Sequence, residues 1–168
     1  AVAIGIVPAT RLSFDQSIES LYAEDNPHLR QYLRSKQLFG GDEFVVVAYR
    51  DPQLLTDDGL ARLEKFAAKL EKIPDVLSMQ DLASATKVGN IPLLDAEQMR
   101  ELYRGLLIGD DDQTTAVVLR LQPEHASTRP RAETIAEIRA VAADYQFPVH
   151  IVGEPVQVHD TFRYVEED

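Results

Sequence analysis

The sequence predicts an α+β fold in which an antiparallel four-stranded sheet carries two helices on one face. Two runs rich in β-branched residues, EFVVVAYR at 43–50 and TTAVVLRLQ at 114–122, predict strands. Each is followed by a segment with apolar residues at helical spacing and then by a shorter strand-like run. The order strand, helix, strand therefore occurs twice, and 168 residues are enough for one such domain.

Polar, helical sequence precedes the first strand. The apolar run AVAIGIVPA at 1–9 is shorter than the roughly 20 residues that span a bilayer, and it fits the tail of a signal peptide, the exit from a spanning segment or an ordinary edge strand. A helical pattern begins at Ser13. A further helix is predicted after Asn26, which can cap it, with Pro27 at the first helical position and glycines 40–41 at its end.

The first strand, helix, strand unit occupies residues 43–82. Its first strand has apolar residues of both parities, so both faces of the sheet need cover. Thr56 is predicted to cap the helix, which Pro74 closes, and DVLSMQDL at 75–82 is the returning strand. The apolar side of this helix consists of Leu60, Leu63, Ala67 and Leu70.

An excursion, residues 82–113, separates the two units. It contains a predicted loop, SATKVGNIPLL at 84–94, and a predicted helix within DAEQMRELYRGLLIGDDDQ, which Asp95 is expected to cap. Over thirty residues between two strands are many for a compact domain, and insertions of this length are usually functional.

The second unit begins with the strand at 114–122 and continues with a helix in 129–146 and a strand in 147–155. The helix gathers its apolar residues on one side: Ile135, Ile138, Val141, Ala142 and Tyr145. The whole order is that of the split βαβ, or ferredoxin-like, unit, here with an N-terminal helix and a helical insertion added. The central strands of that unit are the first and third, which are the two most apolar strands of this chain.

The charge balance argues against nucleic acid as a partner. The chain has 17 basic and 28 acidic residues, a net charge of −11, and a surface of that sign repels phosphate backbones. It has no cysteine, so disulfides, thiolate metal sites and cysteine nucleophiles are excluded.

No sequence motif assembles a catalytic or metal site. Only His150 and His159 could meet, together with Asp160, and we expect a strand residue and a solvated residue there instead. The acidic run GDDDQTT at 109–115 lacks the alternating ligands and terminal Glu of a calcium loop. With no nucleophile-elbow serine and no phosphate-binding glycine loop either, we predict no enzyme, no metal and no cofactor.

Four segments resemble, in order, the first extracytoplasmic domain of RND superfamily exporters, in the branch of MMPL-like hydrophobe and lipid transporters. Their order and spacing carry the resemblance over most of the chain. The segments are DQSIESLYAEDNPHLRQYLRSKQLFGGDEFVVVAYRD (15–51), IPDVLSM (73–79), LLIGDDDQTTAVVLRL (106–121) and IVGEPVQVHDTFRYVEED (151–168).

The resemblance implies a porter domain between the first and second membrane helices of a proton-driven exporter, on the periplasmic side of the bacterial inner membrane. Residues 1–12 would be a juxtamembrane segment, 13–155 the porter domain, and 156–168 the start of a helix leading to the membrane. The implied partners are a second porter domain of the same protein, further copies of the parent transporter, and a hydrophobic or lipid-like substrate.

The resemblance also makes the excursion a candidate for a surface that faces substrate or a partner. Its candidate residues are Leu93, Leu94, Met99, Leu102, Tyr103, Leu106 and Leu107. A simpler explanation is that these side chains cover the second face of the sheet. The alternative function is a stand-alone ligand-sensing or regulatory module, because ferredoxin-like folds also bind small molecules at sheet faces and dimer edges.

Overall fold

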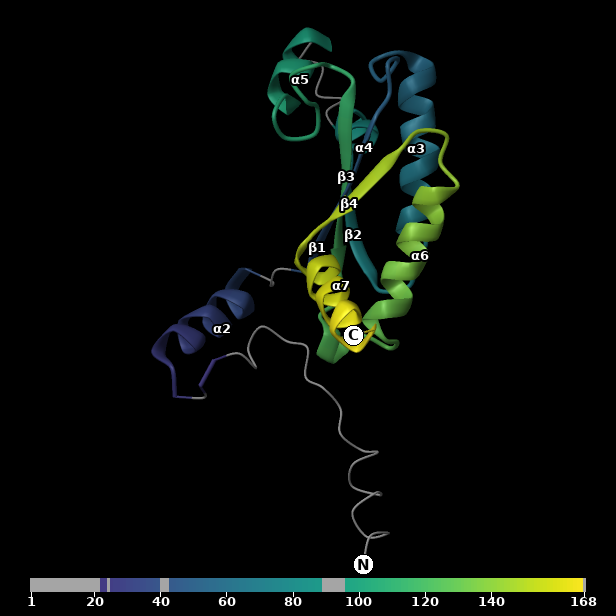
Figure 1. Ribbon diagram of the computed structural model, residues 1–168. Coiled ribbons are helices and arrows are strands. Elements are labelled where there is room, and N and C mark those ends of the chain that lie inside the picture. Colours follow the sequence, from purple (N-terminus) through teal and green to yellow (C-terminus); the bar gives the residue numbers. More distant parts are fainter. Residues whose placement is uncertain (1–21, 24, 40–42, 89–95, 168) are drawn as a thin grey trace, which may run out of the picture. The chain divides into compact units, whose positions relative to one another are not determined.

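The structure is a computed structural model that describes residues 22–23, 25–39, 43–88 and 96–167 (Figure 1). The chain divides into two units, residues 42–160 and residues 1–41 with 161–168. Helix α2 (Pro27–Phe39) belongs to the smaller unit. The helical pattern predicted from Ser13 falls almost wholly outside the described residues, and the segment expected at 1–12 lies outside them entirely.

The larger unit contains one antiparallel sheet, ordered β2-β3-β1-β4. Its strands are β1 (Phe44–Arg50), β2 (Val76–Gln80), β3 (Thr114–Leu121) and β4 (Val149–Val152). The two most apolar strands, β1 and β3, pair along their whole length at the centre, as predicted. The α+β ferredoxin-like arrangement is therefore confirmed.

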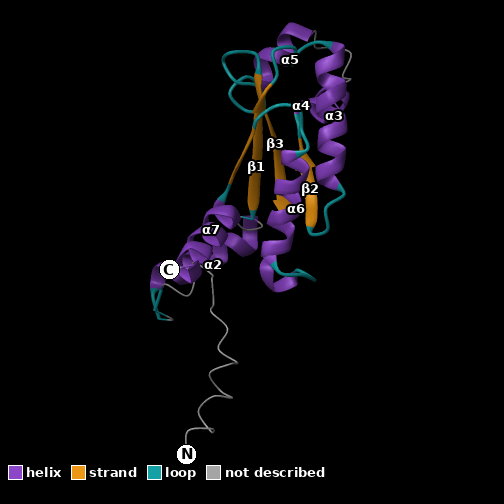
Figure 2. Ribbon diagram, turned by 45° about the vertical axis from the view of Figure 1, so that its right-hand side comes forward, coloured by secondary structure: helices purple, strands orange, loops and turns teal. Residues whose placement is uncertain are grey.

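Two helices cover one face of this sheet, α3 (Asp57–Glu71) and α6 (Arg131–Ala143), as Figures 1 and 2 show. Helix α3 lies against β2 and β3, α6 lies against β4, and the two helices contact each other. Alternate residues of the central strands point into this layer and are buried: Val45, Val47, Tyr49, Thr115, Val117, Leu119 and Leu121. They pack with the buried side of α3, which includes Leu63, Phe66, Ala67 and Leu70.

The opposite face of the sheet, here called the open face, is apolar but only half-covered. Its apolar residues are Phe44, Val46, Ala48, Ala116, Val118 and Val152. Four of them are half-buried, whereas Phe44 and Val152 are exposed. The sheet therefore has one core face and one face with apolar side chains still within reach of solvent.

Two helix starts agree with the sequence. Thr56 caps α3, because its side-chain oxygen accepts from the Gly59 N–H at 3.2 Å. Helix α2 begins at Pro27, and the His28 N–H donates to the Asn26 side chain at 2.9 Å. Both predicted caps are confirmed, and each satisfies a backbone donor that the first turn of a helix leaves without a partner.

The loop predicted at 84–94 is wrong over its first part, which belongs to helix α4 (Leu82–Val88). Asp81 starts this helix: its carboxylate accepts from the Ser84 N–H at 3.0 Å and from the Ser84 hydroxyl. Leu82 and Ala83 then bury their side chains in the core. Residues 89–94 lie outside the described part of the chain.

The helix predicted after Asp95 is confirmed but shorter, since α5 covers Ala96–Tyr103 and ends before Leu106. The C-terminal helix expected from residue 156 is present as α7 (Glu154–Glu167), which begins two residues earlier, and a short 3-10 helix covers Glu124–Ala126. Of the helices that the structure describes, none combines the length and apolarity that crossing a membrane requires.

Candidate functional site

The candidate residues of the excursion divide by exposure. Leu102 on α5 and Leu106 just beyond it are 55% and 73% exposed. Tyr103 and Leu107 are partly buried and pack against the core. Two large apolar side chains, four residues apart, are thus displayed to solvent while their neighbours anchor the same segment.

The rest of the excursion strengthens the core on the helix-covered face. Leu82 and Ile108 are buried in the cluster that also holds α3 and the central strands. Of the remaining candidates, Leu93 and Leu94 lie outside the described residues, and so does the side chain of Met99. The described apolar side chains of the excursion from Arg100 onward are therefore either exposed or packed against the core cluster.

A hydrogen-bonded turn positions Leu106. The Tyr103 carbonyl accepts from the N–H groups of Leu106, Leu107 and Ile108 at 3.1, 2.9 and 3.0 Å. The Gly105 N–H donates to the Ile108 carbonyl at 2.7 Å, and Gly105 has a φ of 76°, which favours glycine. The backbone at Leu106 is therefore fixed by its own hydrogen bonds.

Ion pairs connect α5 to the acidic turn before β3. Arg100 Nε donates to Asp112 Oδ1 at 3.0 Å and its terminal nitrogen also contacts that carboxylate. Arg104 donates to the same carboxylate at 2.9 Å. Because Arg100 lies on α5 before Leu102 and Arg104 lies between Leu102 and Leu106, these contacts brace the segment that carries the exposed leucines.

Asp111, beside Asp112 in the acidic turn, accepts hydrogen bonds from the turn's own residues. Asp111 accepts from the N–H groups of Thr114 and Gln113 at 2.7 and 3.0 Å and from the Thr114 hydroxyl at 2.9 Å. These bonds, led by the one from the Thr114 backbone, lower the pKa of Asp111 below its usual value. The acidic run at 109–115 therefore closes on its own backbone.

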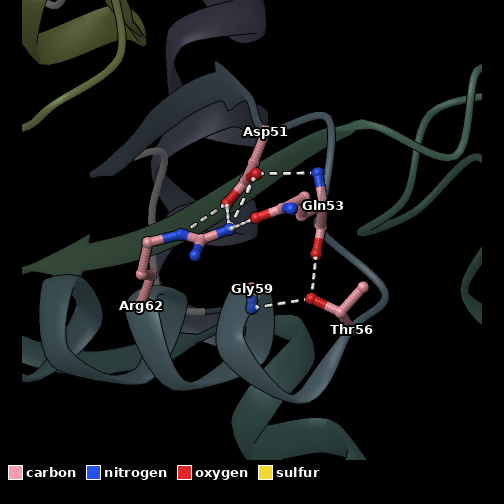
Figure 3. A network of polar contacts seen from close by, with 5 residues as sticks. All are labelled: Asp51, Gln53, Thr56, Gly59 and Arg62. Atoms are coloured by element: carbon pink, nitrogen blue, oxygen red, sulfur yellow. Dashed lines mark hydrogen bonds and ion pairs between the residues drawn. The ribbon is translucent and has the colours of Figure 1, made fainter.

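A second polar network lies beside this turn, at the connection from β1 to α3 (Figure 3). Asp51 is completely buried, and Arg62 of α3 holds its carboxylate with bonds of 2.8 to 3.0 Å. The carboxylate also accepts from the Gln53 N–H at 2.8 Å, and the Gln53 carbonyl accepts from the Thr56 hydroxyl at 2.8 Å. Sequence reasoning missed this pair, and the only local signal was the Asp-Pro turn at 51–52.

The two histidines that the sequence placed within reach of Asp160 lie on different elements, His150 on β4 and His159 on α7. His150 is an exposed strand residue on the open face, opposite Ala48. Asp160 pairs with Arg139 at 2.7 and 2.8 Å. Within the described ranges, no three His, Asp or Glu side chains gather as a metal site would need.

The excursion thus displays two exposed leucines on a segment that ion pairs and turn hydrogen bonds hold. No protein-family model matches the chain, and no curated protein sequence matches it either. Function therefore has to be inferred from the geometry of this surface and from the sequence patterns.

Proposed function

We propose that this chain is a non-enzymatic, extracytoplasmic porter domain of a proton-driven RND-family exporter of hydrophobic or lipid-like molecules, on the periplasmic side of the bacterial inner membrane. The observation that carries the proposal is the exposed pair Leu102 and Leu106 on its braced segment. In this function the pair forms part of a wall along which an apolar molecule passes.

The placement of the family-like segments supports the proposal. Residues 73–79 form the end of the first crossover and most of β2, residues 106–121 form the braced turn and β3, and residues 151–168 include the end of β4 and all of α7. The resemblance therefore follows the sequence of structural elements. A ferredoxin-like fold alone would not establish transport, because the fold serves many functions.

The strength of the surface suits a transient contact. Burying one leucine completely is worth roughly 1.5–3 kcal/mol, and these two are already partly covered. Ordering a ligand costs several kcal/mol, which offsets most of that gain. A pair of exposed leucines can therefore hold an apolar molecule briefly and release it, as a path requires, whereas an enclosed apolar pocket would retain it.

The proposal is tested in the full parent protein by replacing both residues, Leu102→Ser with Leu106→Ser. Cells expressing the variant should accumulate a hydrophobic fluorescent dye faster than cells expressing the wild type. Leu77→Ser is the matched control, because Leu77 is 54% exposed but lies on β2, outside the excursion. Circular dichroism of the isolated chain checks that each variant folds.

Unchanged dye accumulation in the double variant would contradict the proposal that Leu102 and Leu106 line the path of an apolar molecule. Equal effects of the double variant and Leu77→Ser would show a general loss of function in place of a local one. If the parent gene encoded no membrane-spanning segments beside this domain, the transporter assignment itself would fail.

A second candidate function is a ligand-sensing or regulatory module. The observation that favours it is the half-covered open face, where Phe44 is 42% exposed and Val152 is 51% exposed. In that case the parent gene should encode soluble or DNA-binding sequence beside the domain. A hydrophobic ligand should then protect the amides of the open face from hydrogen exchange, and leave those of the excursion unchanged.

A further inference from the structure

The two edges of the sheet differ in how well they are protected. Edge strand β2 carries a bulge between Val76 and Ser78. Bulges prevent an edge from pairing with another chain. Within the described part of the chain, β4 pairs only with β1 and has no bulge, so its outer edge stays open.

The sequence around β4 contains none of the charges that usually protect an edge. Residues 145–153 read YQFPVHIVG and include no Asp, Glu, Lys or Arg. Lysine and inward-pointing charges are common means of preventing edge pairing, and this segment lacks both. In a chain with a net charge of −11, two copies repel each other least where such an uncharged strand meets its equivalent.

We propose that β4 is a self-association edge, where β4 of a second copy pairs antiparallel around a two-fold axis. The two four-stranded sheets then form one sheet of eight strands. This inference does not depend on the transporter proposal, because it follows from the edge and its charge. A failure of either leaves the other standing.

The alternation of side chains restricts the register of this pairing. Residues directly opposite each other in an antiparallel pair lie on the same face. In β4, His150 and Val152 lie on the open face and Ile151 on the helix side. The two-fold axis must therefore pass between the two copies of one residue, so that this residue lies opposite itself. The overlap of so short a strand is greatest when that residue is His150 or Ile151.

The helix layer permits the approach. Neighbouring strands lie about 4.8 Å apart, whereas the axes of packed helices lie about 8–10 Å apart. The helices that cover two paired edge strands can therefore come close only if the sides that face each other carry small residues. Helix α6 lies against β4, and it exposes four alanines at helical spacing, Ala132, Ala136, Ala140 and Ala143. Arg139 on the same flank pairs with Asp160 of the helix that follows β4, so this flank faces the β4 side.

The chain has no cysteine, which makes single-cysteine crosslinking a direct test. A residue on the axis faces its own copy with Cα atoms about 4.5–5.5 Å apart, within the reach of a disulfide. Mild oxidation should convert either His150→Cys or Ile151→Cys to a covalent dimer of twice 18.8 kDa. Leu77→Cys, on the protected edge, is the matched control and should stay monomeric.

Sedimentation equilibrium of the cysteine-free chain provides the second measurement. The wild type should dimerise with rising concentration, Val152→Lys should weaken the dimer at least tenfold, and Leu77→Lys should leave it unchanged. A monomer at about 1 mM chain would overturn the proposal. So would a dimer that neither edge cysteine crosslinks, or crosslinking by Leu77→Cys to the same extent.

Discussion

Two aspartates at the same end of the sheet show how burial separates a fixed ion pair from one that can rearrange. Asp51 follows β1 and Asp112 precedes β3, and the Asp51 N–H donates to the Gln113 carbonyl at 2.8 Å, so the two turns are neighbours. Arg62 of α3 holds the Asp51 carboxylate. Arg100 of α5 and Arg104, which follows α5, hold the Asp112 carboxylate. The Asp51 side chain is completely buried, whereas that of Asp112 is 30% exposed.

This difference in burial determines whether each corner, the turn from β1 to α3 or the turn before β3, can rearrange. A buried carboxylate must keep its partner, because an uncompensated charge in the interior is strongly destabilising. A solvated ion pair contributes between zero and about 1 kcal/mol, so it can loosen or re-form without loss of the fold. The β1–α3 corner is therefore fixed, whereas the ion pairs of the excursion beside it can rearrange without loss of the fold.

Asp51→Ala should have the largest effect. It removes the partner of Arg62 and the acceptor of the Gln53 N–H, and we expect a loss of about 3 kcal/mol in the free energy of unfolding, since Arg62 keeps some access to water. The matched variant Asp112→Ala should lose less, about 1–2 kcal/mol, because its solvated ion pairs contribute little and alanine tolerates the φ of 55° less well than aspartate. Urea denaturation measures both.

The ratio of these two losses is the decisive quantity. Equal losses in the free energy of unfolding would mean that the buried Asp51 and the part-exposed Asp112 contribute equally to stability. The excursion would then be as integral to the fold as α3. A large loss in Asp112→Ala alone would reverse the comparison. The m-value should stay constant in all variants, so that the change reflects the folded state.

Alanine substitutions at Gly59 and Gly105 test the same comparison at the backbone. A Cβ on Gly59 would lie 1.9 Å from the Gln53 carbonyl oxygen, so Gly59→Ala must displace the buried corner and should cost about 2 kcal/mol. A Cβ on Gly105 would meet no atom within 4 Å, so Gly105→Ala costs only the strain of its positive φ, about 1 kcal/mol. Thermal unfolding followed by circular dichroism should rank them in this order, and the reverse order would contradict the assignment of the fixed corner.

The strands and caps were predictable because they depend on local sequence. The β-branched runs of β1 and β3 have one plausible conformation, and the Thr56 cap is a short-range contact. Helix α4 was missed because its helical signal is weak: only seven residues long, it depends on the Asp81 cap and on burial of its first residues. The pair of Asp51 and Arg62 depends on how α3 returns along the sheet, which periodicity does not encode.

The candidate surface shows the same limit. Helical spacing groups Leu102, Tyr103 and Leu106, yet the structure divides them, because α5 ends at Tyr103 and Gly105 turns the chain. One of the three then faces the core and two face solvent. Sequence reasoning located the segment, but the exposed pair within it follows from the end of the helix and from the bonds to the Tyr103 carbonyl.

The smallest predicted effect is the pH response of the acidic turn. Hydrogen bonds from Thr114 and Gln113 lower the pKa of Asp111 below its ordinary 3.8, so their stabilisation is complete above that pH and is lost as the pH falls through the lowered value. The Thr114 amide proton should report this loss as a change in chemical shift with a midpoint below 3.8. Asp111→Asn should abolish the titration and leave the fold intact. A midpoint at or above 3.8 would show that these hydrogen bonds do not hold the Asp111 carboxylate, and that Asp111 does not close the acidic turn.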